Sequence, residues 1–452
     1  MLPHGRWLLL PVRPATVNAM IYTCQDLTVH LLDRLRLVQQ ELGQERAQPV
    51  DPDARLADVI DSMGMVEFLA VLAEDCRVKS EAIDECVDRS FGTVAELAAA
   101  LLAAGVVPRH GSADAGPTES APQPTAASPG GTTKSGHVRM AWLAATTVRL
   151  PDTVQRAAAI NAAIHRPAGW LESRAGIEQR RVWAGQDPLA AAAAAGRTCV
   201  AEAGLAVEDL NVLLVTSEAP PLLAGLAAGL HDRLGLPPRT VTLEVGGACT
   251  GFLAALWLAQ VLLPRAGAVL IVSLEAPSQH LHLRPGPAGE TAALFGDAAA
   301  AAVLCEEATN RGAVPLLAVM LGAEGRAGGL LQVRPSATGG VEVLMDGGVL
   351  AGRAIHAMAQ AVRDLARDHA LTVGALAAVV AHGGNGRMPA LVARKLGLPA
   401  ERVWSETART GNLGSASLPV AWAAHQPCPA GPVAWTAVGA GLTWAAALTG
   451  SG

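Results

Sequence analysis

The sequence predicts an α/β protein made of a duplicated strand–helix unit and preceded by a small all-helical module. Three observations support this fold class. Apolar strand-like runs alternate with alanine-rich helices after residue 138, one segment of this region recurs far downstream, and a stretch rich in Pro and Gly separates the region from helix-period sequence before it. Alternating strands and helices are typical of helices packed on the faces of a sheet.

The N-terminal module, predicted to span 21–106, has the apolar spacing of amphipathic helices. Helices are expected over 27–42, 62–76 and 94–102, with a short one around Ile83. Gly43 and Gly105 follow two of these segments and predict their ends. Residues 1–20 are expected to be disordered. Residues 107–137 are rich in Pro, Gly, Ser, Thr and Ala without periodicity, which predicts a flexible linker.

The remaining residues, 138–452, are predicted to form two related halves, about 138–310 and 311–452. Arg233-Leu-Gly-Leu-Pro237 recurs as Lys395-Leu-Gly-Leu-Pro399, and a glycine turn with an apolar helix follows each copy. Strands are expected at 138–143, 212–216, 241–245, 268–274, 299–304 and 377–381. Helices are expected at 189–204, 222–234, 252–263 and 352–365.

Cys249 carries the strongest chemical signal in the sequence. It lies in Gly-Gly-Ala-Cys-Thr-Gly-Phe between a predicted strand and an apolar helix, where the helix N-terminus favours a thiolate. A free cysteine is also commonly a small buried hydrophobe, so the motif alone leaves both interpretations open.

The duplicated unit places Asn412 at the strand end equivalent to that of Cys249, and His382 closes a neighbouring strand. Sites gather at the carboxyl ends of parallel strands, so Cys249, His382 and Asn412 are expected to converge. The ordinary alternatives are a buried histidine and a turn-forming asparagine.

Composition excludes several classes of function. The net charge is −6 and the pI about 6.1, without a basic tract, which argues against nucleic-acid binding. The seven cysteines are scattered without CxxC or Cys/His spacing, which argues against disulfides and a metal site. We expect no membrane span and a cytoplasmic location. Aromatic residues make up only 3% of the chain, so the core should consist of Ala, Leu and Val.

Ser62 opens the second predicted helix within Asp61-Ser62-Met63. Serine is a common N-cap residue, which is the structural interpretation. The helical module with this motif nevertheless resembles an acyl carrier protein. The resemblance implies 4′-phosphopantetheine attached to Ser62 by a phosphopantetheinyl transferase. Acidic residues of the same helix would face partner enzymes, although a solvated face is the alternative; they are Glu67, Glu74 and Asp75.

Six motifs of the large module resemble, in order, those of β-ketoacyl-acyl-carrier-protein synthase III of the thiolase-like superfamily. They are Trp170-Leu-Glu-Ser-Arg-Ala-Gly-Ile-Glu-Gln-Arg-Arg181, Gly247-Ala-Cys-Thr-Gly-Phe252, Leu294-Phe-Gly-Asp297, His382-Gly-Gly-Asn385, Gly411-Asn-Leu-Gly-Ser-Ala-Ser-Leu-Pro419 and Gly439-Ala-Gly-Leu-Thr-Trp444. The resemblance implies a duplicated, thiolase-like layered α-β-α-β-α fold after a four-helix carrier domain, and a homodimer.

The resemblance also implies a role for each site residue. Cys249 would hold the starter acyl group, taken from an acyl-CoA or acyl-carrier thioester, and the amides of Cys249 and Gly441 would form the oxyanion hole. His382 and Asn412 would stabilise the enolate formed when a malonyl extender loses carbon dioxide. Coenzyme A or pantetheine binding is implied for Trp170, Arg174 and Asn385, and docking of the chain's own or a separate carrier for Arg387, Arg394 and Lys395. No metal is implied.

The expected activity is acyltransferase chemistry followed by decarboxylative Claisen condensation, in specialised polyketide or lipid biosynthesis. The second hypothesis is acyl transfer to a hydroxyl or amine without decarboxylation, and the third is a non-catalytic partner subunit. Retention of Asn412 favours condensation. The sequence departs from the family at Gly383-Gly384, which replace Gln-Ala, and at Gly289, which replaces an arginine that contacts CoA in some members.

Overall fold

The computed structural model describes residues 23–41, 50–56, 60, 62–78, 83, 93–108, 141–218, 225–336, 341–345 and 347–450. The chain divides into two compact units, one of residues 1–60 and 68–114 and the other of residues 61–67 and 115–452. The predicted disordered segment 1–20 and nearly all of the predicted linker lie outside the described residues.

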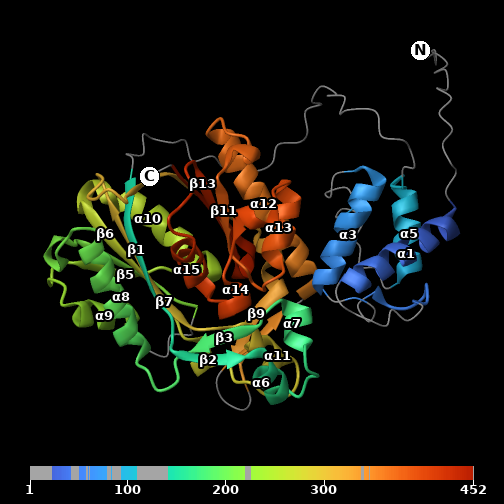
Figure 1. Ribbon diagram of the computed structural model, residues 1–452, viewed down its shortest axis with the longest axis horizontal. Helices are drawn as coiled ribbons and strands as arrows, with labels where there is room; N and C mark the ends of the chain where they lie inside the picture. The colour runs from blue at the N-terminus through green and yellow to red at the C-terminus, as the bar shows by residue number, and fades with distance from the viewer. Residues whose placement is uncertain are drawn as a thin grey trace, which may run out of the picture. The chain divides into compact units, whose positions relative to one another are not determined.

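Among the described residues of the N-terminal region, three helices follow one another in the order that the apolar spacing predicts (Figure 1). Thr93 caps the third, because its hydroxyl accepts the N–H of Glu96 while the Glu96 carboxylate accepts the N–H of Thr93. Gly105 follows with a φ of +72°, as expected of a residue that ends a helix. The predicted piece around Ile83 lies almost wholly outside the described residues. The bounds are α1 (Cys24–Glu41), α3 (Ser62–Cys76) and α5 (Val94–Ala103).

Ten strands of the large unit form one continuous sheet, in the order β12-β11-β13-β14-β8-β1-β7-β6-β4-β5. The first half contributes β1 (Ala141–Arg149), β4 (Val212–Thr216), β5 (Val241–Glu244), β6 (Ala268–Glu275) and β7 (Ala298–Cys305). The second contributes β8 (Val314–Ala323), β11 (Ala378–Ala381), β12 (Val403–Trp404), β13 (Val433–Gly439) and β14 (Thr443–Thr449).

The two halves have the same topology, which confirms the predicted duplication. In the first half β4 pairs in parallel with β5 and β6, and β7 then pairs antiparallel with β6 and β1. In the second half β11 pairs in parallel with β12 and β13, and β14 then pairs antiparallel with β13 and β8. Three residue pairs between β1 and β8 join the halves.

Helices cover both faces of each half and create the five layers of the predicted α-β-α-β-α fold (Figure 1). One outer layer is α8 (Pro188–Glu202) with α9 (Leu226–Leu234), and the other is α12 (Gly347–Asp368) with α13 (Met388–Leu396). The central layer is α10 (Gly251–Ala266) with α15 (Ser417–Ala424). Both central helices contact strands of both halves, so the duplicated units share one interior.

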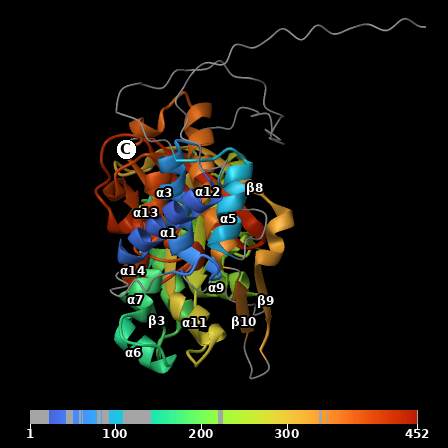
Figure 2. The ribbon, with the colours of Figure 1, turned by 90° about the vertical axis from the view of Figure 1, so that its right-hand side faces the viewer.

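Shorter elements gather beyond the layers. Strand β10 lies beside α11, as Figure 2 shows. The hairpins are β2 (Thr153–Arg156) with β3 (Gln179–Val182), and β9 (Leu331–Pro335) with β10 (Val341–Met345). The short helices are α6 (Ala157–Ala163), α7 (Trp170–Ala175), α11 (Pro287–Leu294) and α14 (Thr407–Thr410).

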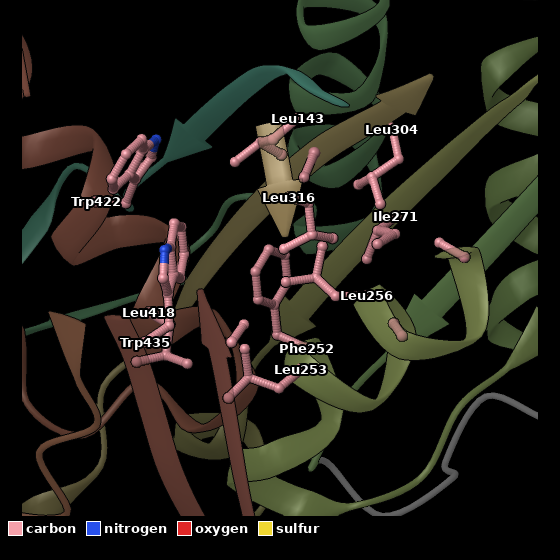
Figure 3. Packing of buried hydrophobic residues seen from close by; sticks show 14 of the residues in the cluster. Leu143, Phe252, Leu253, Leu256, Ile271, Leu304, Leu316, Leu418, Trp422 and Trp435 are labelled. Carbon is pink, nitrogen blue, oxygen red and sulfur yellow. The ribbon is translucent and has the colours of Figure 1, made fainter. Parts of the chain in front are cut away.

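Aromatic rings concentrate in the central layer, although aromatic residues are scarce in the chain. Phe252 stacks on Trp435 with ring centroids 6.0 Å apart, and Trp435 lies 4.9 Å from Trp422. Aliphatic side chains of both halves surround the rings (Figure 3). Offset aromatic pairs add stabilisation beyond the area they bury. The expectation of an Ala, Leu and Val core is therefore correct for the outer layers and incomplete for the centre.

The stretch Ala248–Ala266 is long and apolar enough to cross a membrane by length and composition, which the sequence analysis did not anticipate. The helix was predicted to end at Leu263, whereas α10 continues through Pro264 and Arg265 to Ala266. Half of the stretch is buried inside the molecule, where α10 packs in the central layer. Core helices of globular proteins commonly have this composition.

Asp297 ties the start of β7 to two distant segments. Its carboxylate is fully buried and accepts the N–H of Trp183 at 2.8 Å, the N–H of Ser278 at 3.0 Å and the Ser278 hydroxyl. Burial raises the pKa of Asp297. The hydrogen bonds from Ser278 and Trp183 and the positive charge of Arg180 oppose this shift. Such a carboxylate holds three segments in one arrangement.

Replacing Asp297 with alanine is expected to lower the free energy of unfolding by about 2–4 kcal/mol, because two buried N–H groups lose their acceptor. Urea unfolding followed by circular dichroism measures the change. Asp232→Ala, at an exposed position of α9, is the matched control and should change the value by less than about 0.5 kcal/mol. Equal effects in the two variants would contradict the structural role of Asp297.

Candidate active site

A strained turn presents Cys249 at the start of the central helix. The turn, η2 (Ala248–Thr250), lies between β5 and α10. Gly247 and Ala248 have φ angles of +131° and +52°, and the N–H and hydroxyl of Thr250 donate to the Gly247 carbonyl at 3.0 and 2.6 Å. A left-handed alanine is uncommon and persists where surrounding structure holds it. Cys249 is partly exposed, as a nucleophile must be.

His382 lies at the end of a strand, as predicted, whereas Asn412 follows the short helix α14 and does not directly follow β12. His382 directly follows β11 and donates its N–H to Thr436 of β13 at 2.9 Å. Asn412 donates its N–H to Leu294 at 2.7 Å, and its Oδ1 accepts the N–H of Gly414 at 2.9 Å. The two residues are 3% and 5% exposed. Both side chains are therefore held inside the protein.

The Cys249 turn contacts segments of the second half. It packs against η7 (Gly414–Ala416) and the end of β13. Thr250 Oγ1 lies 3.1 Å from Thr443 Oγ1 across this junction. A side chain at Gly439 would lie 3.2 Å from the Thr250 nitrogen and would clash with the Gly247 carbonyl, so the approach requires glycine. The site is thus built by residues of both halves.

Two carboxylates beside Cys249 were missed by the sequence analysis. Glu218 follows β4, Glu275 ends β6, and the N–H of Glu218 donates to both Glu275 oxygens at 3.2 and 2.9 Å. Glu275 also accepts the N–H and hydroxyl of Ser415 at 3.1 and 2.5 Å. A Cβ at Gly414 would lie 2.9 and 3.0 Å from the two carboxyl carbons. Their positions at strand ends of the first half were the available signal.

These carboxylates change the expected chemistry of Cys249. Burial, the negative charge of Glu218 and a hydrogen bond to Glu218, with a further effect of Glu275, raise the pKa of Cys249 well above its usual value. The prediction that the helix N-terminus favours a thiolate is therefore wrong for the resting site. The macrodipole contributes a partial charge, whereas the two carboxyl groups and the loss of solvent act more strongly.

Burial raises the pKa of Glu218 to about 7, and the hydrogen bond from Cys249 opposes the shift. Burial and the charge of Glu218 raise the pKa of Glu275 well above its usual range. Burial lowers the pKa of His382 to about 4, so its imidazole is neutral near pH 7. Its Nδ1 is buried without a hydrogen-bond partner among the described residues.

Comparison with known proteins assigns the family. The family model of 3-oxoacyl-[acyl-carrier-protein (ACP)] synthase III matches residues 243–325, and the model of its C-terminal part matches residues 366–450. The 3-oxopimeloyl-[acyl-carrier-protein] synthase of Rhodothermus marinus is 35% identical over 302 residues, which cover 62% of this chain and 85% of that protein. The chain belongs to the 3-oxoacyl-, or β-ketoacyl-, acyl-carrier-protein synthase III family.

Solved structures agree with this assignment. Synthase III from Pseudomonas aeruginosa PAO1 aligns with a TM-score of 0.62 and 28% identity over 69% of this chain and 98% of that one. The priming β-ketosynthase from the R1128 polyketide biosynthetic pathway aligns with a TM-score of 0.62 and 26% identity over 69% and 97%. The large unit has the thiolase-like fold and is a condensing enzyme of the synthase III type.

The residues expected at the synthase III entrance lie around α7 and α13. The Arg174 guanidinium lies 5.9 Å from the Trp170 ring centroid, and Arg166 lies 5.5 Å from it. The N–H of Gly386 donates to Ala175 at 2.8 Å, which brings the loop before α13 against the end of α7.

The other predicted binding residues follow on that loop and on α13. Asn385 Oδ1 accepts the N–H groups of Arg387 and Met388 at 3.0 and 3.2 Å, so this oxygen shapes the loop. Arg394 is exposed and Lys395 partly exposed at the end of α13. Gly441 has a φ of +80° and open space beside its Cα. The Ser62 side chain lies outside the described residues, so the pantetheine site stays a prediction.

The two departures from the synthase III motifs have physical explanations. A side chain at Gly289 would clash with the backbone of Arg284, so no arginine fits at this position. At Gly383 the hydroxyls of Ser405 and Thr407 fill the space of a side chain, and Thr407 Oγ1 donates to the Gly383 carbonyl at 3.0 Å.

Proposed function

We propose that this synthase III condenses a starter acyl group on Cys249 with a malonyl-type carrier thioester, with loss of carbon dioxide. The observation that carries the proposal is the junction of the two halves, where the Cys249 turn contacts η7 and the end of β13, next to the backbone segments of His382 and Asn412. Covalent attachment would divide the reaction into acyl loading and carbon–carbon bond formation.

In loading, the Cys249 sulfur attacks the thioester carbonyl. The Cys249 N–H hydrogen-bonds the sulfur of the same residue. We assign the oxyanion hole to this N–H and that of Gly441. In condensation, neutral His382 and Asn412 donate hydrogen bonds to the extender carbonyl. The Asn412 Oδ1 accepts the N–H of Gly414, which leaves its amide N–H₂ as the donor. These bonds stabilise the enolate that attacks the acyl-cysteine.

We propose further that the N-terminal helices form a fused acyl carrier domain with 4′-phosphopantetheine on Ser62. Three amphipathic helices with a serine opening the second support this assignment. A tethered carrier raises the effective concentration of its thioester at the synthase. A chain with its own carrier suits specialised polyketide or lipid assembly, and one similar structure is a priming ketosynthase of a polyketide pathway.

Intact-protein mass spectrometry with acyl-CoAs, acyl carriers and malonyl-carrier tests the proposal. We expect acylation of the chain, release of carbon dioxide and a β-ketoacyl product. Acylation with transfer to an added alcohol or amine and no carbon dioxide would instead support simple acyl transfer. A chain that takes no acyl group would be a non-catalytic partner, and the proposed function would be wrong.

His382 provides a prediction on pH. Because burial lowers its pKa to about 4, the imidazole should stay neutral from pH 5 to 8. In a Cys249→Ala background, which isolates this step, decarboxylation of malonyl-carrier should therefore show no midpoint near pH 6.5. Further replacement of His382 with alanine should slow it about 10²–10³-fold through loss of a donor. A histidine-dependent loss of rate below pH 6.5 would contradict this assignment.

A further inference from the structure

We propose that Glu218 is the catalytic base of acyl loading, taking the proton from the Cys249 thiol as the sulfur attacks and delivering it to the departing thiol. This inference rests on the proposed function, since it describes the first half of that reaction. It assigns a role to a carboxylate that none of the six recognised motifs contains.

The contacts single out Glu218 among the groups near the sulfur. The charges that act on the thiol are those of Glu218 and Glu275, and of these two only Glu218 hydrogen-bonds the thiol. The Oε1 of Glu218 is buried and has no partner among the described residues. Glu218 is therefore the carboxylate positioned to interact with the thiol, and its Oε1 retains capacity to accept a proton.

Glu275 acts as the positioning residue for this base. Its carboxylate accepts the Glu218 N–H and the N–H and hydroxyl of Ser415, which join the ends of β4 and β6 to η7. Both carboxyl groups lie against η7 at Gly414, where a Cβ would be only 2.9 and 3.0 Å from the carboxyl carbons of Glu218 and Glu275, so this position requires glycine.

The protonation equilibria explain why loading requires a base in contact. The raised pKa of Cys249 makes a free thiolate rare near pH 7. Burial places the pKa of Glu218 at about 7, and a catalytic base is most effective when its pKa lies near the working pH. Proton transfer inside the hydrogen bond avoids forming an isolated thiolate beside two carboxyl groups.

The step balances without an oxidant or a metal. Glu218 starts as a carboxylate and Cys249 as a thiol. A bond forms between the sulfur and the acyl carbon while the thiol proton moves to Glu218. The tetrahedral intermediate then breaks its bond to the leaving sulfur of coenzyme A or pantetheine, and Glu218 returns the proton to that sulfur. The products are acyl-Cys249, a free thiol and the original carboxylate.

The first experiment measures the rate of acyl-CoA loading against pH for wild type and Glu218→Gln. The wild-type rate should rise with a midpoint near pH 7 and level off as Glu218 ionises. Glu218→Gln should lack this midpoint and load about 10²-fold more slowly at pH 7, within the usual range for loss of a general base. Glu208→Gln, the same change at an exposed position, should match wild type.

The second experiment uses iodoacetamide, which needs no acyl donor, and reads alkylation at Cys249 by peptide mass spectrometry. The rate of alkylation of wild type should again rise in a step near pH 7. In Glu218→Gln the step should disappear, and the remaining rise should move toward the pKa of a thiol no longer facing that charge. This readout separates proton acceptance by Glu218 from a purely structural contact.

Thermal unfolding checks that the variant folds. The pKa of Glu218 in the folded state is raised, so its contribution to stability is present at low pH and lost as pH rises through about 7. The melting temperature of Glu218→Gln minus that of wild type should therefore be larger at pH 8 than at pH 5.

The outcomes separate this inference from the proposed function. Acyl loading with the same rate and pH profile in wild type and Glu218→Gln would remove the role of Glu218 and leave the condensing function intact. If wild type takes no acyl group but shows the alkylation step that Glu218→Gln loses, the condensing function fails and the thiol–carboxylate pair stands.

Discussion

Replacing Cys249 with alanine is expected to abolish acyl loading, with a fall of at least about 10⁴-fold in the rate of thioester consumption. The turn that precedes α10 places Cys249, a partly exposed residue, at the junction of the two halves. Without the sulfur, a thioester can meet the same hydrogen-bond donors but no nucleophile. Intact-protein mass spectrometry should show the acyl mass on wild type and none on the variant.

Cys428→Ala is the matched control for this experiment, because Cys428 is also a partly exposed free cysteine but lies outside the described site. It should load as wild type does. An equal acyl mass on Cys249→Ala would place the acyl group on another residue and would overturn the proposed mechanism. Circular dichroism should show both variants folded, since alanine at position 249 removes a single atom.

Replacing Ser62 with alanine should abolish attachment of 4′-phosphopantetheine by a phosphopantetheinyl transferase. The modification forms an ester with a serine hydroxyl, and alanine offers no oxygen. Acyl loading on Cys249 from acyl-CoA should continue unchanged, because that step uses a different nucleophile. The β-ketoacyl product should no longer appear on the chain itself. Mass spectrometry of peptides that contain residue 62 or residue 249 separates the two effects.

Ser90→Ala, at another serine of the N-terminal region, serves as the control and should be modified as fully as wild type. Modification that persists in Ser62→Ala would remove the carrier assignment while leaving the synthase assignment in place. Loss of Cys249 loading in Ser62→Ala would show that the carrier supplies the acyl group, in contrast to direct loading from acyl-CoA.

Local pattern predicted the elements whose sequences have a clear period. Helices α3 and α5 and strands β4, β6 and β7 lie within a few residues of the predicted bounds. Strands β13 and β14 were not predicted individually, because their Ala, Gly, Thr and Trp residues are mostly buried on both faces and show little alternation. Strand β8 was also not predicted individually, and its residues are mostly partly or fully exposed. Helix α12 begins at Gly347, earlier than the predicted start at residue 352.

Part of the candidate site could be predicted from residue type and from position along the chain. A cysteine in a glycine-rich turn, with a histidine and an asparagine in the second copy of the repeated unit, indicated candidate residues near the junction of the two halves. Glu218 and Glu275 were not predictable from a motif, because each is an isolated acidic residue after an apolar strand. Only the parallel pairing of β4 and β6 brings them together beside η7.

The sequence by itself determined the duplicated α/β fold, the family and the candidate nucleophile, because these depend on order and residue type along the chain. The tertiary structure decided the protonation state of that nucleophile. The pKa of Cys249 depends on solvent exclusion and on charges from two other strands. Such effects vary with distance in space, which separation along the chain does not give.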